Sequence, residues 1–349
     1  MPNVAVDYIV VGGGLTGCLV ASRLSQSDQK PEVVLLEAGG GEFNYAYQSE
    51  PVTNTANRVH TLNAGKALGG GSILNYGGWL RADAADYDEW AEIVGDKRWS
   101  YAGIKSWLQK PELFRGSEAH AEEHGFDGPM HITSVSASES GERNPYALGH
   151  RRNLYEVLTV YVPPGIPGIP IDGTHIATST MLLLPTSRGR VSIRSSSPAN
   201  PPRIQPDYFA TQLDRDTLIH AARQTLKLML GTGPMKGIVE GETPPSGEGL
   251  EGSTPLTADA ADEQIEERIR RIGTQHHHSG GTAATGKVVD TEGRVLGVKG
   301  LRVADASIIP LPLGGHPQAT LYGMAEQLVS FIIKDAWRGS CLWNQDTAL

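Results

Sequence analysis

The sequence has too few cysteines for a disulfide scaffold or a thiolate zinc site. Its 349 residues include two cysteines, Cys18 and Cys341, which lie far apart and form no Cys-x-x-Cys motif. No apolar run is long enough to span a bilayer, and the first residues lack the basic flank and cleavage site of a signal peptide. We therefore expect a soluble, cytoplasmic protein with no membrane partner.

Runs of basic residues are also absent. Lysine and arginine number 30 against 39 aspartate and glutamate residues, the net charge is −9, and no basic run exceeds a pair. This balance argues against a nucleic-acid partner and favours a small-molecule substrate. With 39% hydrophobic residues, the chain can bury one large core or two modest ones, and we expect two interlocked domains.

The amino-terminal residues carry the pattern of a βαβ unit. Residues 7–14 form an apolar, β-branched run that ends in glycines, residues 15–26 have helical spacing, and residues 32–40 read as a second buried strand. Two helices around a turn are predicted for residues 86–110, where Pro111 ends the second. Residues 133–175 are rich in serine, proline and glycine, which indicates a domain crossover.

The second half alternates strands and helices. Residues 189–195 alternate like a half-buried strand, and residues 213–230 predict a covering helix with Leu218, Ala222 and Leu226 on one side. Residues 261–272 return to a helical pattern, and the tail predicts a strand, a loop and a long helix.

The turn after the first strand has the spacing of a dinucleotide site. Gly12, Gly14 and Gly17 match Gly-x-Gly-x-x-Gly, and Glu37 closes the second strand twenty residues beyond Gly17. Glycines permit a tight turn and close backbone approach to a pyrophosphate, the helix amino terminus favours its charge, and Glu37 can accept ribose hydroxyls. The motif does not separate FAD from NAD, and a glycine-rich turn that binds nothing is the alternative.

The stretch GKALGGGSILNYGGWLRADAADYDEW, residues 65–90, resembles the first signature of the glucose–methanol–choline (GMC) oxidoreductases. The matching positions are Gly65, Lys66, Leu68, Gly69, Gly70, Gly71, Ser72, Asn75, Ala82 and Asp88. The resemblance implies an α/β fold in which an FAD-binding Rossmann-like domain joins an antiparallel-sheet substrate domain. It also implies flavin contacts from Gly69, Gly70, Asn75, Tyr76, Gly77 and Gly78, whereas a glycine-rich surface loop with a structural asparagine is the other interpretation.

A second signature answers why three histidines stand together at 276–278. The family's carboxy-terminal signature is His-Pro-x-Gly-Thr, and the chain has His278-Ser279-Gly280-Gly281-Thr282. The resemblance therefore makes His278 the functional imidazole, with His276 and His277 as bystanders. A metal site built from His276 and His278 is the alternative, but no Asp, Glu or Cys lies at ligand spacing, so we expect no metal.

The tail resembles the last strand and helix of the family. Asp305 and Ala306 would lie beside the flavin, and His316-Pro317 stands where the family carries His or Asn before Pro. We assign His278 as the base that accepts a hydroxyl proton while a hydride leaves for flavin N5, and His316 as a hydrogen-bond partner of the substrate oxygen. The full set of expected FAD contacts is Gly12, Gly14, Leu15, Thr16, Gly17, Glu37, Ala38, Gly69, Gly70, Asn75, Tyr76, Gly77, Gly78, Asp305, Ala306, Pro317 and Gln318.

The resemblance is interrupted in the middle of the chain. It covers residues 5–132 and 180–336, between which the family has about another domain's worth of chain. We expect an FAD domain over 1–135 and 270–338, a shortened substrate domain over 136–269, and a tail over 339–349. Sheet edges left by the missing block favour a homodimer or a partner subunit.

Three functions remain open. The first is an FAD-dependent oxidation of an alcohol group on a small organic substrate, possibly a specialised metabolite, with reoxidation by oxygen or a carrier. The second is a non-redox lyase, isomerase or cyclase that uses the His278 and His316 pair for acid/base chemistry. The third is a catalytically silent binding subunit.

Overall fold

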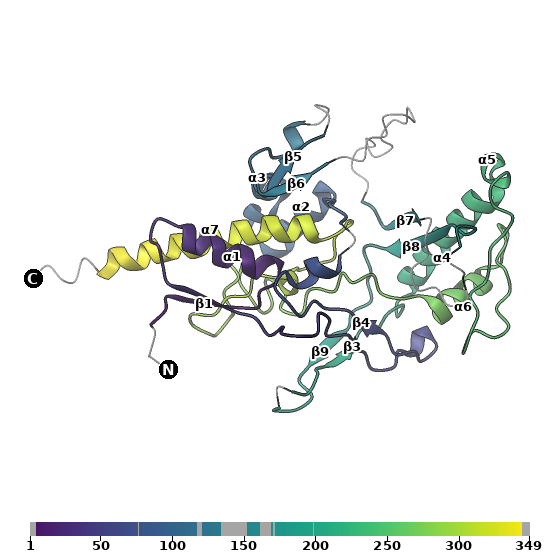
Figure 1. The fold of residues 1–349 in the computed structure, drawn as a ribbon, viewed down its shortest axis with the longest axis horizontal. Helices are drawn as coiled ribbons and strands as arrows, with labels where there is room; N and C mark the ends of the chain where they lie inside the picture. The colour runs from purple at the N-terminus through teal and green to yellow at the C-terminus, as the bar shows by residue number, and fades with distance from the viewer. Residues whose placement is uncertain are drawn as a thin grey trace, which may run out of the picture. The chain divides into compact units, whose positions relative to one another are not determined.

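The chain folds into two compact units. The computed structural model describes residues 5–75, 77–116, 121–133, 152–160, 169, 172–197 and 199–343 (Figure 1). Unit 1 comprises residues 1–46, 63–152 and 278–349, and unit 2 comprises residues 47–62 and 153–277. These bounds differ from the expected domains at residues 47–62, 136–152, 270–277 and 339–349, and the expected domain boundaries stay a prediction. Most of the expected crossover, including 134–151 and 161–168, lies outside the described residues.

Unit 1 begins with the expected βαβ unit. Strand β1 (Tyr8–Val11) pairs in parallel with β2 (Val33–Leu36), Tyr8 opposite Val33, and α1 (Leu15–Gln26) connects them. The other elements of unit 1 are η2 (Gly70–Leu74), α2 (Ala84–Val94), η3 (Lys97–Trp99), α3 (Tyr101–Gln109), β5 (Glu112–Phe114), η4 (Ala121–Glu123), β6 (Met130–Ile132), η6 (Ala306–Ile308) and α7 (Gln318–Trp343).

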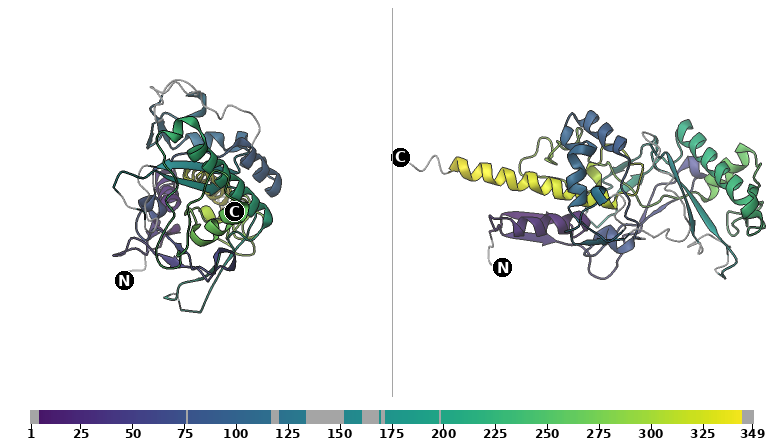
Figure 2. Two further views of the ribbon diagram at one scale, coloured as in Figure 1. Left: turned by 90° about the vertical axis from the view of Figure 1, so that its right-hand side faces the viewer. Right: turned by 90° about the horizontal axis from the view of Figure 1, so that it is seen from above.

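Two helices cover one face of the β1–β2 pair. α1 lies alongside α7 (Figures 1 and 2), and Val20 and Leu24 of α1 pack with Ala325 and Val329 of α7 into a buried cluster. Tyr8, Val10 and Val33 of the strands pack against this cluster. The β1–β2 pair, from which the glycine turn leads into α1, is thus anchored to the carboxy-terminal helix.

A second core joins α2, α3 and α7. Its fully buried members include Tyr87, Trp90, Ile104 and Leu108. Gly323 on α7 makes the crossing with α3 possible, since a Cβ there would lie 2.7 Å from a Leu108 methyl carbon. Both predicted helices of the 86–110 stretch are present, and α2 ends at Gly95 in the left-handed conformation.

Unit 2 is built from short antiparallel pairs and helices. Its strands are β3 (Tyr47–Gln48), β4 (Thr61–Leu62), β7 (Tyr155–Val160), β8 (Ala177–Leu182), β9 (Arg190–Ser192) and β10 (Arg203–Gln205). Its helices are η1 (Thr53–Thr55), α4 (Gln212–Leu226), the π-turn η5 (Lys227–Gly231), α5 (Gly233–Lys236) and α6 (Asp262–Ile272). α4 packs on the β7–β8 pair and, through Ile219, on Leu256, Ala260 and Ile265.

One expectation for unit 2 is wrong, and another is confirmed in part. The strand at 189–195 is not half-buried, since Val191 is 49% exposed and Ile193 87% exposed, because β9 pairs with β10 alone. The most buried apolar residues of α4 are Ile219 and Ala221. Of the three expected residues, Ala222 and Leu226 are half-buried and pack against the same cluster as Ile219, and Leu218 is half-buried. Which side chains of a helix or strand are buried depends on the elements that pack against it. The periodicity of its own sequence does not specify those elements.

Every sheet in the described part of the chain has two strands. Parallel sheets are normally covered on both faces, but here the outer face of β1 leaves Ile9 61% and Val11 82% exposed. None of the described helices is both long enough and apolar enough to cross a bilayer.

Candidate functional site

The turn between β1 and α1 has the conformation that an anion site requires. Gly12 has a φ of +97°, which favours glycine, and a Cβ on Gly17 would lie 2.0 Å from the Gly12 carbonyl oxygen. The amino terminus of α1 carries no side-chain cap and no acidic residue in its first turn, which begins with Leu15 and the buried Thr16. Its N–H groups and dipole favour a negatively charged ligand.

Glu37 lies beside this turn. Its carboxylate accepts the N–H of Gly13 at 2.7 Å through one oxygen and the N–H of Gly39 at 2.7 Å through the other. Ala38, between Glu37 and Gly39, is exposed. A carboxylate offers about four lone-pair sites, so two remain for hydroxyl donors of a ligand.

The second glycine-rich segment packs directly on the first. The Gly69 N–H donates to the Gly13 carbonyl oxygen at 2.7 Å, and a Cβ on Gly70 would lie 2.7 Å from the Gly14 Cα. Both Gly69 (φ +98°) and Gly70 (φ +52°) adopt the left-handed conformation. The two motifs that the sequence separates by more than fifty residues therefore form one backbone surface.

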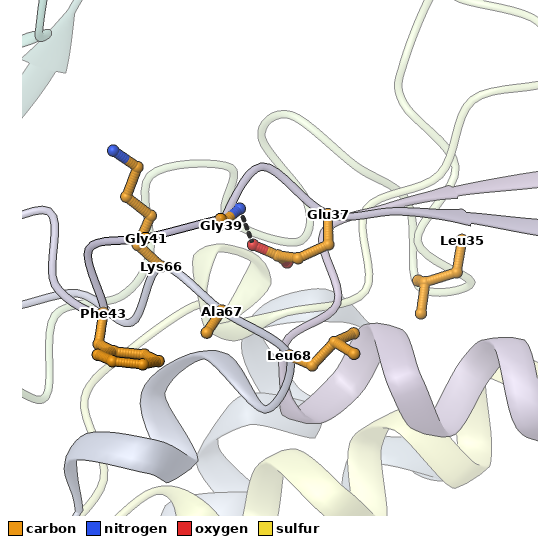
Figure 3. A pocket seen from close by; sticks show the side chains of 9 residues that line it. Leu35, Glu37, Gly39, Gly41, Phe43, Lys66, Ala67 and Leu68 are labelled. Atoms are coloured by element: carbon orange, nitrogen blue, oxygen red, sulfur yellow. Dashed lines mark hydrogen bonds between the residues drawn. The ribbon is translucent and has the colours of Figure 1, made fainter.

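A cavity of about 630 Å³ opens next to Glu37. It is lined by Leu35, Glu37, Gly39, Gly40, Gly41, Phe43, Lys66, Ala67 and Leu68, and Figure 3 shows the Glu37 carboxylate turned toward the Gly39 N–H. The Glu37 carboxylate, with two lone pairs left, suits a ribose, and the apolar walls suit a base. The bare amino terminus of α1, which is not part of this lining, suits the pyrophosphate of the same dinucleotide. The residues present therefore fit such a cofactor.

The loop after η2 is braced by its own asparagine. Asn75 donates from Nδ2 to the Ser72 carbonyl oxygen at 2.7 Å, and its Oδ1 accepts the Gly77 N–H at 2.7 Å. One amide hydrogen and one lone pair of Asn75 remain for a ligand. Tyr76 lies outside the described residues, and Gly78 is exposed.

The segment that carries His278 lies on the Asp305–Ile309 turn. The Gly281 N–H donates to the Ala306 carbonyl oxygen at 3.0 Å, and a Cβ on Gly280 would lie 2.7 Å from that oxygen. Asp305 accepts the Ser307 N–H at 2.9 Å and so caps η6. These bonds fix the backbone on which the exposed His278 stands.

His278 and His316 meet in unit 1. Their ring centroids lie 4.9 Å apart with an interplanar angle of 69°. A Cβ on Gly78 would lie 3.6 Å from His316 Nδ1, so the loop of the first signature lies against this ring. Pro317 follows His316, and α7 begins at Gln318. The structure thus brings the two signature histidines together.

The other two histidines belong to unit 2. The rings of His276 and His277 lie 6.4 Å apart, and His277 has a φ of +59°. His277 Nδ1 and Gln275 Nε2 lie 2.7 Å apart, and its N–H donates to Gln275 Oε1. This local bracing of His277 is what a structural residue of a turn shows. Ring nitrogens of His276, His278 and His316 lie within 4.8 Å of one another, so the metal site considered for His276 and His278 stays an alternative.

Sequence reasoning missed several residues around the site. Phe43 lines the cavity from an irregular loop, where no periodicity marks a lining residue. Asp86 is fully buried and accepts the Gly314 N–H at 2.9 Å, two residues before His316. An aspartate at a buried position of α2 is the signal that could have identified it, because buried carboxylates need partners.

Comparison with known families agrees with this geometry. Two family models described as GMC oxidoreductase match residues 6–150 and 185–325. The chain belongs to the GMC oxidoreductase family. The family's cofactor is FAD, and the glycine turn, Glu37 and the cavity fit it.

Relatives from fungi and bacteria are similar to this GMC chain. The GMC-type oxidoreductase acuG of Aspergillus aculeatus is 25% identical over 523 positions, covering 94% of this chain and 99% of the relative. The oxygen-dependent choline dehydrogenase of Paraburkholderia phytofirmans is 36% identical over 149 residues, 37% of this chain and 26% of the relative. The patulin synthase of Aspergillus clavatus is 36% identical over 166 residues, 46% of this chain and 25% of the relative.

Solved structures share the fold. Pyridoxine 4-oxidase from Mesorbium loti has a TM-score of 0.76 at 19% identity, over 93% of this chain and 99% of that chain. A formate oxidase has a TM-score of 0.77 at 18% identity, over 95% of this chain and 98% of that chain. The expected α/β fold with an FAD-binding Rossmann-like unit is confirmed.

The chain is a shortened member of the family. The acuG alignment has 523 positions against 349 residues, so at least 174 positions have no residue of this chain. The two family matches leave residues 151–184 between them. In the alignments to the choline dehydrogenase and the patulin synthase, the chain spans about a quarter of those relatives.

Proposed function

We propose that this chain binds FAD and oxidises an alcohol group of a small organic substrate, a compact specialised metabolite. The observation that carries the proposal is the meeting of His278 and His316, with ring centroids 4.9 Å apart, beside the loop of the glycine-rich signature. Of two neighbouring imidazoles, one can accept the proton of the substrate hydroxyl, and the other can hydrogen-bond to the hydroxyl oxygen and orient it.

The protein's own part in the reaction is proton transfer and orientation. A ring nitrogen of neutral His278 accepts the hydroxyl proton of the substrate. His316 donates a hydrogen bond to the same oxygen and fixes its position, and the positive amino end of α7, which begins at Gln318, supports the negative charge that develops there. General-base assistance of this kind contributes about 10²- to 10⁴-fold in rate.

The cofactor would be held by the interlocked glycine segments. Gly12 to Gly17 and the start of α1 would bind the pyrophosphate, Glu37 the ribose, and Gly69 to Gly78 the flavin side. When bound, FAD supplies the acceptor for the hydride that leaves the carbinol carbon.

A second candidate is non-redox acid/base chemistry by the same histidine pair. The observation that favours it is the β1–β2 sheet, which has two strands in the described residues and an exposed outer face. A reduced sheet gives fewer backbone positions for the adenosine end of FAD. In that case the pair would catalyse elimination, isomerisation or cyclisation.

FAD uptake separates the two candidates. Purified protein titrated with FAD should acquire the visible spectrum of bound flavin, and Glu37→Ala should weaken binding by about 1.5–3 kcal/mol through loss of charge-assisted bonds. Glu32→Ala, which removes the same charge just before β2, is the matched control and should leave the affinity unchanged. A colourless wild-type protein that takes up no FAD rules out the redox proposal.

A further inference from the structure

The loop that carries His316 is held in place by a buried carboxylate on another element. Asp86 on α2 has no exposed surface and accepts the Gly314 N–H through Oδ2 at 2.9 Å. Gly314 stands two residues before His316, so this bond fixes the approach of the chain to the imidazole. Burial of an ionised carboxylate is costly unless it is paired and hydrogen-bonded.

Arg152 supplies the pairing. Its Nε donates to Asp86 Oδ1 at 2.7 Å, one terminal nitrogen lies 2.6 Å from the same oxygen, and the other lies 2.5 Å from Glu89 Oε2. Burial raises the pKa of Asp86, while the Gly314 N–H and the Arg152 guanidinium oppose that rise. Arg152 therefore favours the ionised carboxylate that holds Gly314.

Two further contacts fix the same loop on the same side. The Trp90 Nε1–H donates to the Leu311 carbonyl oxygen at 3.0 Å. A Cβ on Gly315 would lie 3.1 Å from the Arg81 carbonyl oxygen, so the backbones of the loop and of the segment before α2 are in close contact. α2 and the residues leading into it thus form the support for residues 311–316.

We propose that Asp86, paired with Arg152, is a positioning residue for His316: it holds the Gly314 amide and thereby sets the imidazole against His278. Neither residue touches the reacting atoms in this role. Arg152 stands just beyond the family match that ends at residue 150, so the family models do not assign it. The inference rests on the proposed role of His316, but its first readout needs neither FAD nor a substrate.

The experiment compares two double variants that differ in one hydrogen-bond acceptor. Asp86→Asn with Arg152→Met keeps an oxygen acceptor for Gly314 and removes both charges. Asp86→Ala with Arg152→Met removes the charges and the acceptor. In labelled protein without FAD, the His316 ring resonances, assigned through His316→Ala, should stay near the wild-type positions in the first and shift or broaden in the second.

FAD affinity and rescue give a second readout. Arg152→Met should raise the dissociation constant for FAD by roughly tenfold, because the loop that carries His316 loses its support, and Arg152→Lys should recover most of the loss. If the wild-type protein takes up no FAD, the proposed function fails, and the resonance comparison still decides the positioning role.

The matched control is Arg23→Met. Arg23 is 30% exposed and lies 2.6 Å from the fully buried Glu326, as Arg152 is 31% exposed beside fully buried Asp86. The Arg23–Glu326 pair joins α1 to α7, whereas Asp86, the partner of Arg152, accepts the Gly314 N–H of the loop at residues 311–316. Arg23→Met should lower the melting temperature and leave the His316 resonances unchanged. Identical resonances in the two double variants would overturn the proposal. A change of the His316 resonances in Arg23→Met as large as that in the Asp86→Ala, Arg152→Met variant would overturn it as well.

Discussion

At the residue scale, we predict unequal roles for the three consecutive histidines. His278 pairs with His316 in unit 1, whereas His276 and His277 lie in the last turn of unit 2. We expect His278→Ala to lower kcat/KM at least 100-fold, the lower range of general-base assistance, and His276→Ala to leave it within a few-fold. His316→Asn, which keeps a hydrogen-bond donor, should lose less than His316→Ala.

The pH profile tests the same assignment. If His278 is the base, the profile of kcat/KM should contain an ionisation that His278→Ala removes. Equal damage from alanine at 276, 277 and 278, together with loss of a bound metal, would favour a metal site instead. Full activity in the His278→Ala, His316→Ala double variant would place the chemistry outside the pair.

His60 gives a pH prediction that does not involve catalysis. It is 4% exposed, its Nε2 lies 2.7 Å from Thr55 Oγ1, and burial, with a smaller effect of the Arg58 charge, lowers its pKa to about 4. An unfolded histidine has a pKa of about 6.5, so between pH 6.5 and 4 the unfolded state binds the extra proton. Stability is therefore full above pH 6.5 and falls as the pH drops.

The expected loss is about 2 kcal/mol between pH 7 and pH 5. Urea unfolding of wild type and His60→Gln at the two pH values measures it, because the variant lacks this titration and should show a smaller difference. A pH dependence that is the same in both proteins would mean that His60 is as accessible to protons in the folded state as in the unfolded one.

At the scale of elements, the strand–turn–helix at the amino terminus depends on Gly17. A Cβ at this position would lie 2.0 Å from the Gly12 carbonyl oxygen, a clash with rigid backbone. We expect Gly17→Ala to open the turn, weaken FAD at least tenfold and lower the melting temperature. Gly241→Ala, where a Cβ meets nothing within 4 Å, is the control and should do neither.

The same elements show which features of the fold could be predicted from the sequence. The βαβ unit was predictable because its period, its glycines and its acid are local, and α1 spans the predicted residues 15–26. The buried side of a strand or helix was harder to predict, as Ile193 and Leu218 show. It depends on packing partners that are distant in the sequence. The support of His316 by Asp86 and Arg152 joins residues 66 and 228 positions apart, a pairing that no local pattern encodes.

At the scale of the whole molecule, the chain lacks a central segment of the family, and it has a sheet with an exposed face. Each of the five sheets in the described residues has two strands, and β1 exposes Ile9 and Val11 on the face opposite α1 and α7. Apolar strand faces beside unpaired edges tend to be covered by another chain. The alignment to acuG has at least 174 positions without a residue of this chain.

We therefore expect the protein to self-associate, with the outer face of β1 in the interface. Sedimentation at micromolar concentration should give a dimer, and Ile9→Lys should shift it toward monomer, because a charge at a buried interface without a partner is costly. Ile93→Lys is the matched control, since Ile93 is 52% exposed and belongs to helix α2. A stable, well-folded wild-type monomer contradicts the prediction. Equal dissociation by both variants would assign the association to general surface hydrophobicity rather than to the β1 face.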